Sequence, residues 1–327
     1  MKLNIAILAG GDSSESVISL QSAEQIRQQL DKEKYNTYTV FVKGDEWTVT
    51  SDLFCDTIVN KNDFSFNFEG KKIKFDFALI AIHGTPGEDG KLQAYFDMLK
   101  IPYSTSDVLT SAVTFNKYFC KAVLNYEGII SAKAKLIRKG ENINYNDIIE
   151  YCGLPCFVKP NAGGSSFGIS KVKNEKELPD AINKALKEDD EVIIEEFIAG
   201  TEVTCGVMEI NGKITALPVT EIVSENEFFD YEAKYSGKSK EITPARISEE
   251  QTKAVQNLSE KIYQKLNCKG VVRIDYIINK ENVNFIEINT VPGMSRESII
   301  PQQLKYFGIS VSEMYDYIIT KVCKSNI

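Results

Sequence analysis

The chain has 327 residues, of which 43% are hydrophobic and 26% charged, a composition typical of a globular protein with more than one domain. Its net charge is −8, and no cluster of Lys and Arg is large enough to suggest a nucleic-acid partner. The apolar run at the N-terminus ends after a few residues at two glycines, and no other run approaches membrane-spanning length. We therefore expect neither a signal peptide nor a membrane partner.

The seven cysteines are scattered along the chain without the spacing of a disulfide framework. This pattern is typical of free thiols in a reducing cytosol, so we expect a cytoplasmic protein. Cys152 and Cys156 form a C-x3-C pair, but no second Cys/His pair lies nearby and the chain has a single histidine. A zinc site is therefore not expected.

The first hundred residues predict an α/β domain built on a parallel sheet. An apolar strand runs into Gly10 and Gly11, and a helix with 3.6-residue apolar spacing follows, which is how a parallel α/β sheet begins. The expected strands lie at residues 3–9, 37–42 and 75–82, and the expected helices at 16–30 and 90–99. We place this N-terminal domain at residues 1–100.

A small central α+β domain is expected at residues 101–196. Its expected helices lie at residues 115–124 and 175–186, and its expected strands at 132–137, 156–159, 169–172 and 192–197. The segment "KPNAGGSSFG" interrupts this pattern and predicts a loop.

From residue 197 the chain alternates as antiparallel strands do, with a hairpin turn at Asn211-Gly212. The other expected elements are a polar, aromatic-rich loop at 224–243, an amphipathic helix at 248–266, a hairpin at 272–289 and a helix at 310–322. A C-terminal domain with an antiparallel sheet is therefore predicted at residues 197–327. The fold class is α/β (α+β).

The last hairpin, "VRIDYIINKENVNFIEIN", carries charged residues in otherwise apolar strands. Residues two apart on a strand face the same side, so Arg273 points with Asp275, and Glu287 points with Asn289. Burying an unpaired charge costs several kcal/mol or more, so something must compensate these groups. Oxygen ligands of this kind suit Mg²⁺ bound to a phosphate. The alternative is an ordinary antiparallel pair with one solvated face.

The segment "VKPNAGGSSFGIS" places two glycines and two serines after Lys159. Backbone N–H groups next to glycine, hydroxyl donors and a lysine cation together favour a phosphate-binding loop. Taken alone, the segment fits a plain surface loop equally well.

Two further segments place polar groups where ligands bind in α/β proteins. The only histidine, His83, lies in "HGTPGEDG" after an expected strand, and Glu15 follows the first strand in the same way. A lone histidine is more often structural. The segment "VIIEEFIAGTE" offers an aromatic and acids at a strand end, suited to a purine and its ribose, although a core Phe197 and a solvated Glu202 explain it as well.

The aromatic-rich loop at 224–243 is interpreted in two ways. Four aromatics lie within "FFDYEAKYSGKSKEITP", which suggests a lid that closes over a site. The alternative is an edge segment that packs on its own domain.

Together, "HGTPGEDG", "GGSSFGISKV", "FFDYEAKY" and "RIDY…FIEINTVPGM" resemble the motifs of the ATP-grasp superfamily, specifically of the D-alanine–D-alanine ligase family. The likeness runs from "AILAGGDSSE" to "TVPGMSRESIIP", nearly the whole chain. It implies an ATP-grasp fold and an enzyme that joins two D-alanines through D-alanyl phosphate, releasing ADP and phosphate, for peptidoglycan precursor synthesis. It also implies two Mg²⁺ ions, with Mn²⁺ as a substitute, ATP as co-substrate and a homodimer.

The resemblance implies a role for each matching residue. The implied ATP-binding residues are Lys117, Lys159, Ser166, Glu195, Glu196, Phe197, Ile198, Glu202, Phe228 and Lys234. The implied metal ligands are Asp275, Glu287 and Asn289. The residues implied to act on or near the two D-alanines are Glu15, His83, Ser165, Tyr235, Arg273, Gly293, Ser298 and Ile299.

The resemblance also implies a specific role for each residue near the two D-alanines. Glu15 is implied to hold the ammonium of the first D-alanine, and Ser165 and Tyr235 to tie the glycine loop to the lid. Arg273 and the N–H of Gly293 are implied to stabilise the oxyanion. Ser298 and Ile299 are implied to contact the carboxylate of the second substrate. His83 is implied to lie near both substrates.

Other functions remain open at this point. Ligases that make D-alanyl-D-lactate or D-alanyl-D-serine resemble the same family, but Tyr235 is typical of the dipeptide-forming type. A different ATP-grasp ligase would lack the set of Glu15, Ser165 and Tyr235, and a non-catalytic ATP-binding module would have lost a metal ligand or Arg273. One departure from the family is Gly164, where we expect an acidic or other polar residue, and it predicts a looser loop.

Overall fold

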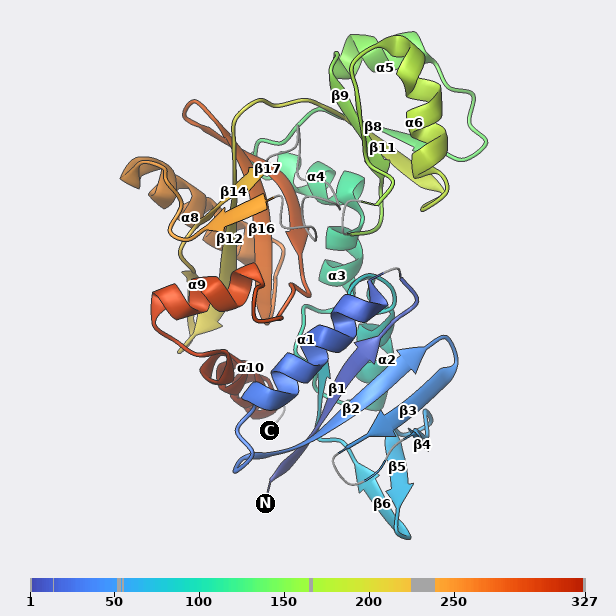
Figure 1. Cartoon of the computed structure of the whole chain (residues 1–327), viewed down its shortest axis with the longest axis vertical. Coiled ribbons are helices and arrows are strands. Elements are labelled where there is room, and N and C mark those ends of the chain that lie inside the picture. The colour runs from blue at the N-terminus through green and yellow to red at the C-terminus, as the bar shows by residue number, and fades with distance from the viewer. Residues whose placement is uncertain are drawn as a thin grey trace.

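The computed structural model describes residues 2–13, 15–51, 54, 56–164, 167–224 and 239–325. Figure 1 shows three groups of strands, one for each of the three larger sheets, with α3 and α4 beside the third sheet. Five of the residues singled out above lie outside the described residues: Ser165, Ser166, Phe228, Lys234 and Tyr235. Most of the expected lid loop lies outside them too.

The first sheet has the strand order β4-β3-β2-β1-β7. Its strands are β1 (Leu3–Gly10), β2 (Tyr35–Lys43), β3 (Glu46–Thr50), β4 (Thr57–Ile58) and β7 (Phe77–Ile80). The parallel pairing of β1 with β2 and β7 confirms the predicted parallel sheet. Strands β3 and β4, which add antiparallel to this core, were not predicted. Neither was the hairpin of β5 (Ser65–Phe68) and β6 (Lys71–Lys74).

Two predicted helices accompany this sheet, α1 (Ser16–Gln29) and α2 (Lys91–Leu99). Helix α1 buries Ser19, Ser22, Ala23 and Ile26, so its inward face carries hydroxyls as well as apolar groups. The Ser22 hydroxyl accepts a hydrogen bond from the N–H of Met294, in the loop that follows β17.

The central sheet has the order β10-β9-β11-β8 and is antiparallel. Its strands are β8 (Ala134–Arg138), β9 (Cys156–Pro160), β10 (Ser170–Val172) and β11 (Glu191–Glu196). The helical elements of this region are α3 (Val108–Phe115), α4 (Lys117–Tyr126), α5 (Tyr145–Cys152), the short 3₁₀ helix η1 (Glu175–Glu177) and α6 (Leu178–Ala185). Helix α5 was not predicted.

The single helix expected at 115–124 was wrong in its start. Asn116 has an extended backbone (φ −86°, ψ 101°), which ends α3, and its side chain accepts a hydrogen bond from the N–H of Phe119. Asparagine is a strong N-cap because its oxygen satisfies a free N–H of the first turn. Two helices therefore meet at Asn116.

The third sheet has the order β15-β14-β12-β16-β17, and β13 pairs with β12. Its strands are β12 (Thr201–Ile210), β13 (Lys213–Ala216), β14 (Thr220–Ser224), β15 (Ser239–Ile242), β16 (Val271–Asn279) and β17 (Asn282–Asn289). The antiparallel pairing confirms the predicted sheet and both hairpins. Its helices are α8 (Glu249–Lys265), α9 (Ile299–Phe307), which was not predicted, and α10 (Val311–Ser325).

One apolar core joins the first sheet to the end of the chain. Ile7 of β1 and Ile26 of α1 belong to the same buried cluster as Leu304 of α9 and Tyr315 of α10. Figure 1 shows α1 and α10 beside each other. This packing brings α1 close to the segment that follows β17.

The described cysteines are free thiols, as the scattered spacing predicted, and Cys120, Cys152, Cys156, Cys205 and Cys268 are buried. Among the residues that the structure describes, no helix is both long and apolar enough to span a bilayer.

Candidate active site

A cleft of about 1090 Å³ is lined by residues of the second and third sheets, and by α1 and the loop after β7, which lie next to the first sheet. It brings together most of the residues singled out from the sequence, namely Glu15, His83, Lys159, Glu195, Glu196, Phe197, Ile198, Glu202, Arg273, Asp275, Glu287, Asn289, Gly293, Ser298 and Ile299. Lys117 reaches the same region, because its ammonium lies 3.6 Å from Glu287. Segments far apart in sequence thus meet at one place.

The β16–β17 hairpin places its polar residues opposite one another. Asp275 pairs with Glu287 in the ladder, and Arg273 pairs with Asn289. The guanidinium of Arg273 contacts both oxygens of Asp275, with Nε at 3.0 Å and Nη2 at 2.9 Å. Burial opposes the charge of Arg273, but the facing carboxylate of Asp275 outweighs it and raises the pKa of the guanidinium. The buried charges therefore compensate one another in part.

The donor set of this hairpin fits a hard divalent cation. Asp275 and Glu287 offer carboxylate oxygens from adjacent strands, and Asn289 adds an amide whose nitrogen lies 3.3 Å from Asp275. In the part of the chain that the structure describes, no group of three or more His, Cys, Asp or Glu side chains could hold a metal. Two carboxylates with substrate phosphates and water are the usual ligands of Mg²⁺.

Two lysines meet one buried carboxylate at the other wall of the cleft. Glu195 of β11 lies 2.9 Å from the ammonium of Lys121 and 2.6 Å from that of Lys159. Burial alone would raise the pKa of Glu195, but the two ammonium groups outweigh burial and lower it to about 2. The same ion pair outweighs the burial of Lys159 and raises its pKa.

Lys121 was not among the residues singled out from the sequence. It stands one turn after Lys117 on α4, and residues four apart share a helix face, so this spacing was a usable signal. Lys117 donates to the carbonyl of Gly163 in the glycine loop, at 2.6 Å. Helix α4 therefore delivers two ammonium groups to the cleft region.

The carboxylate of Glu15 lies against the glycine loop. A Cβ built on Gly164 would sit 2.7 Å from Oε2 of Glu15, closer than real Cβ contacts come. A side chain at this position therefore requires the carboxylate of Glu15 to shift. This close approach is a steric reason for glycine at position 164, which the sequence alone did not show.

Two buried titratable groups lie behind Glu15 in the "HGTPGEDG" loop. Glu88 accepts hydrogen bonds from the N–H groups of Gly84 (2.7 Å) and Val291 (3.3 Å). Burial, and secondarily the charge of Glu15, raise the pKa of Glu88 to about 8. Burial lowers the pKa of His83. Sequence reasoning missed Glu88, although it lies within the motif that contains His83.

The segment expected to face a purine leaves the central sheet at the end of β11. The ring of Phe197 is 36% exposed, and the ammonium of Lys171 lies 4.3 Å from its centroid. The neighbouring Glu196 accepts a hydrogen bond from the N–H of Lys133 at 2.8 Å, which fixes the strand end. An exposed aromatic face at a cleft wall is able to stack on a base.

At the opposite wall, Ser298 is the N-cap residue of α9, and its hydroxyl lies 2.7 Å from that of Ser295. Ile299 begins the helix, and Gly293 lies close by, since a Cβ there would be 3.0 Å from the Ser298 hydroxyl. A helix N-terminus favours an anionic group.

Family models cover almost the entire chain. Residues 4–106 match the model described as D-ala D-ala ligase N-terminus, and residues 118–320 match the D-ala D-ala ligase C-terminus. A D-alanine--D-alanine ligase of Bacteroides fragilis is 51% identical over 320 residues, which cover 98% of this chain and 99% of that protein.

Solved structures show the same architecture. D-alanyl-alanine synthetase A from Vibrio cholerae has a TM-score of 0.88 at 28% identity, covering 99% of each chain. The VanG D-Ala:D-Ser ligase from Enterococcus faecalis has a TM-score of 0.84 at 32% identity, covering 98% of this chain and 99% of that one. A Bacillus anthracis D-alanine--D-alanine ligase complexed with ATP has a TM-score of 0.80 at 29% identity, covering 99% of this chain and 98% of that one.

Proposed function

The chain belongs to the D-alanine–D-alanine ligase family and has the ATP-grasp fold, and from this premise we propose that it condenses two D-alanines to D-alanyl-D-alanine, using ATP, for peptidoglycan precursor synthesis. The observation that carries the proposal is the cleft itself. One cavity gathers the acidic hairpin of the third sheet, the ammonium of Lys159 from the central sheet and the carboxylate of Glu15 at the start of α1.

In the first step, a carboxylate oxygen of one D-alanine attacks the γ-phosphorus of ATP, the bond to the bridging oxygen breaks, and D-alanyl phosphate and ADP form. Glu15 holds the ammonium of this D-alanine. Lys117 and Lys159 carry positive charge toward the phosphates, which offsets the negative charge that gathers there. The ion pair of Lys159 with Glu195 fixes that lysine in place.

In the second step, the amine of the other D-alanine attacks the acyl carbon, phosphate leaves with its bonding electron pair, and the amine loses a proton. The tetrahedral intermediate carries an oxyanion, which Arg273 and the N–H of Gly293 stabilise. Its pairing with Asp275 orients the Arg273 guanidinium at the cleft wall. Ser298 and Ile299 receive the carboxylate of the second D-alanine at the start of α9, and His83 lies between the two substrate positions.

Asp275, Glu287 and Asn289 would hold two Mg²⁺ ions, with Mn²⁺ as a substitute. Bound there, the ions supply positive charge to the phosphoryl oxygens. The opposed carboxylates of the hairpin support this assignment.

Glu195, Glu196, Phe197, Ile198 and Glu202 form the proposed adenosine-binding segment, which follows the central sheet into the cleft. Ser165, Ser166, Phe228, Lys234 and Tyr235 stay predictions from the resemblance. The homodimer also stays a prediction from the resemblance. The cytoplasmic location stays a prediction too, and the buried free thiols favour it.

We also propose three domains, at residues 1–100, 101–196 and 197–327. Each proposed domain contains one of the three larger sheets. The shared core of α1 with α9 and α10 ties the first domain to the third.

A D-serine acceptor is the second candidate, because the VanG D-Ala:D-Ser ligase is 32% identical over 98% of this chain. A D-lactate acceptor would require the same fold with a different acceptor subsite. Tyr235 favours D-alanine, as it is typical of the dipeptide-forming enzymes.

The test is phosphate release from ATP and Mg²⁺ with D-alanine, with L-alanine, and with D-alanine plus D-serine or D-lactate, combined with mass analysis of the product. We expect release with D-alanine alone and D-alanyl-D-alanine as product. Release only after D-serine or D-lactate is added would move the acceptor and keep the mechanism. No release under any condition would refute the proposed activity.

A further inference from the structure

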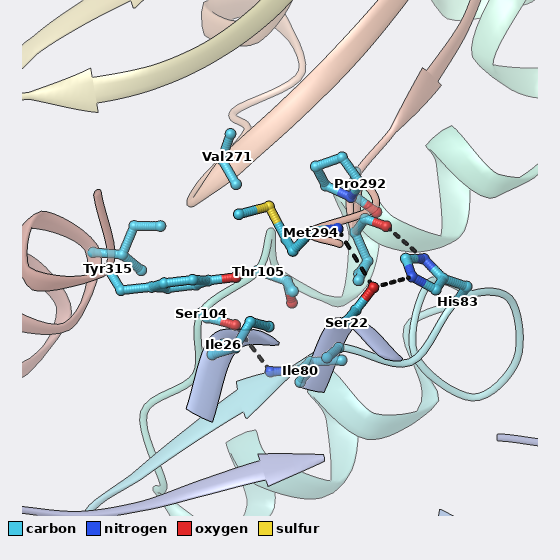
Figure 2. Close-up of a pocket in the computed structure, with 14 residues that line it drawn as sticks. Ser22, Ile26, Ile80, His83, Ser104, Thr105, Val271, Pro292, Met294 and Tyr315 are labelled. Carbon is cyan, nitrogen blue, oxygen red and sulfur yellow. Dashed lines mark hydrogen bonds between the residues drawn. The ribbon is translucent and has the colours of Figure 1, made fainter. Parts of the chain in front are cut away.

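The loop that follows β17, residues 290–294, is held at both ends by side chains from segments next to the first sheet. At its start, Nδ1 of His83 lies 2.9 Å from the carbonyl oxygen of Val291. At its end, the N–H of Met294 donates to Oγ of Ser22, at 3.4 Å. Figure 2 shows Ser22 pointing toward both the imidazole and the Met294 N–H.

These hydrogen bonds determine where the protons lie. A carbonyl oxygen only accepts, so Nδ1 of His83 must be the donor. In the neutral ring, Nε2 is then an acceptor, and the hydroxyl of Ser22, 3.3 Å away, donates to it. The same hydroxyl oxygen accepts from Met294, so each group in the chain has one consistent role. If Nε2 carried a proton, it could no longer accept a hydrogen bond from the Ser22 hydroxyl, and this set of hydrogen bonds could not form.

The surroundings of His83 favour the neutral ring. The side chain is buried, and burial disfavours its charged form. The charged groups that act on it are Glu15, which opposes this shift, and Arg273, which reinforces it. Glu88 lies in the same loop and binds the N–H of Val291.

We propose that Ser22 is a positioning residue for the ligase reaction, acting through His83 and the N–H of Met294 to hold the loop that presents the Gly293 N–H to the cleft. Gly293 lines the cleft and directly precedes the residue that Ser22 anchors. A shift at either anchor therefore moves its N–H. This proposal rests on the proposed function, in which that N–H stabilises the oxyanion.

The energetic reason is preorganisation. A hydrogen-bond donor lowers the barrier only if it already points at the position where negative charge develops. A misplacement of 1 Å, even from a change outside the reacting centre, costs on the order of 100-fold in rate. In this arrangement Ser22 and His83 together hold the loop at residues 290–294. His83 keeps its proton and does not transfer it.

The space beside Ser22 allows a matched pair of variants. A cavity of about 20 Å³, lined by Ser22, Ile26, Met294 and Tyr315 among others, adjoins the hydroxyl (Figure 2). A cavity of this size holds a water molecule, so a methyl group at position 22 has room. Ser22→Ala removes the hydroxyl, whereas Ser22→Thr keeps it and adds one methyl group.

The first experiment uses the fact that the chain has one histidine. With ¹⁵N-labelled histidine in the untagged protein, NMR reports a single imidazole. We expect a proton on Nδ1, a bare Nε2 and no titration from about pH 6 to about pH 8. Ser22→Ala should shift the Nε2 signal, and Ser22→Thr should restore it. A wild-type ring protonated on Nε2, or one that titrates in this range, would overturn the proposal.

The second experiment is steady-state kinetics on the same variants. Ser22→Ala should lower kcat roughly tenfold while leaving the KM for ATP unchanged, and Ser22→Thr should recover most of the loss. Wild-type kcat in Ser22→Ala would refute the positioning role. If the alanine variant does not fold, the wild-type tautomer and the Ser22→Thr variant still decide the question.

Ser19→Ala is the matched control, because Ser19 is one turn earlier on α1 and equally buried. Its hydroxyl donates to the carbonyl of Ala81 and accepts from the N–H of Gly10, away from the loop. This variant should lose stability while keeping kcat and the histidine signal. The histidine signal also separates this proposal from the proposed function. It reports the hydrogen bond between Ser22 and His83 even if the chain proves to have a different acceptor or no ligase activity.

Discussion

The ammonium of Lys121 lies 2.9 Å from the carboxylate of Glu195, and their side chains are only 3% and 6% exposed. Removing one partner of a buried ion pair leaves an uncompensated charge, which costs about 3–5 kcal/mol. Lys121→Met should therefore destabilise the protein by an amount of that order and raise the pKa of Glu195. The carboxylate would then bind Lys159 alone, which changes the position of the Lys159 ammonium, so the KM for ATP should rise.

Urea unfolding and ATP-dependent kinetics check this prediction. The control is Lys133→Met, because Lys133 is exposed. Such a surface change should alter the free energy of unfolding by only about 0.5 kcal/mol or less. Equal stability losses in the two variants would contradict the importance of the buried pair.

Gly164→Ala should weaken the binding of the first D-alanine. The added Cβ would lie 2.7 Å from Oε2 of Glu15, so the carboxylate must move away from its place beside the loop. We expect the KM for the first D-alanine to rise by roughly tenfold or more, because binding depends on that placement. The KM for ATP should change less.

Gly163→Ala is the comparison for this prediction. A Cβ on Gly163 meets no atom within 4 Å, although its φ of +133° strains any side chain. It therefore measures backbone strain in the loop without displacing Glu15. Wild-type binding of D-alanine in Gly164→Ala would show that the position of Glu15 does not limit binding.

Glu287→Gln and Asp275→Asn should each lower turnover by roughly 100-fold or more, because each removes one carboxylate charge from the proposed metal site. Binding of Mn²⁺, followed by electron paramagnetic resonance, should weaken in parallel. Glu209→Gln is the control, as Glu209 pairs with Lys321 outside the residues that line the cleft. Undiminished turnover and Mn²⁺ binding in both hairpin variants would remove the metal assignment.

The buried carboxyl of Glu88 predicts a pH dependence of stability. Its pKa rises from the ordinary 4.5 to about 8 on folding, so the folded protein binds more protons than the unfolded chain between these values. The free energy of unfolding should therefore fall as pH rises through this window, by up to about 1.4 kcal/mol per pH unit from this group. Below 4.5 and above 8 the contribution is constant.

Glu88→Gln provides the comparison, since an amide does not titrate in this range. Urea midpoints across the window should fall with pH more steeply in the wild type than in the variant. Parallel profiles would show that Glu88 is ionised in the folded protein at neutral pH.

Much of the candidate site could be predicted because its signals are local. The two-residue alternation in the last hairpin placed Arg273 with Asp275 and Glu287 with Asn289 on shared faces, and the ladder has that register. The glycine loop and the segment after β11 likewise carry their chemistry in a few consecutive residues. In each case the spacing of a regular strand determines which groups meet.

The missed elements depend on contacts that no local pattern encodes. Strands β3 and β4 are short and lie at one end of the first sheet, where β3 pairs with β2 and β4 pairs with β3. The contact of His83 with Val291 spans 208 residues, and that of Ser22 with Met294 spans 272. Such groups meet only where α1 and the loop after β7 pack against the loop that follows β17.

The shared core of β1 and α1 with α9 and α10 has a consequence for synthesis of the chain. The apolar faces of the first strand and helix leave the ribosome long before the helices that cover them. They must stay exposed until nearly the whole chain is made, which predicts dependence on chaperones during translation. A chain truncated before α10 should accordingly bind a hydrophobic dye, whereas the full-length protein should not.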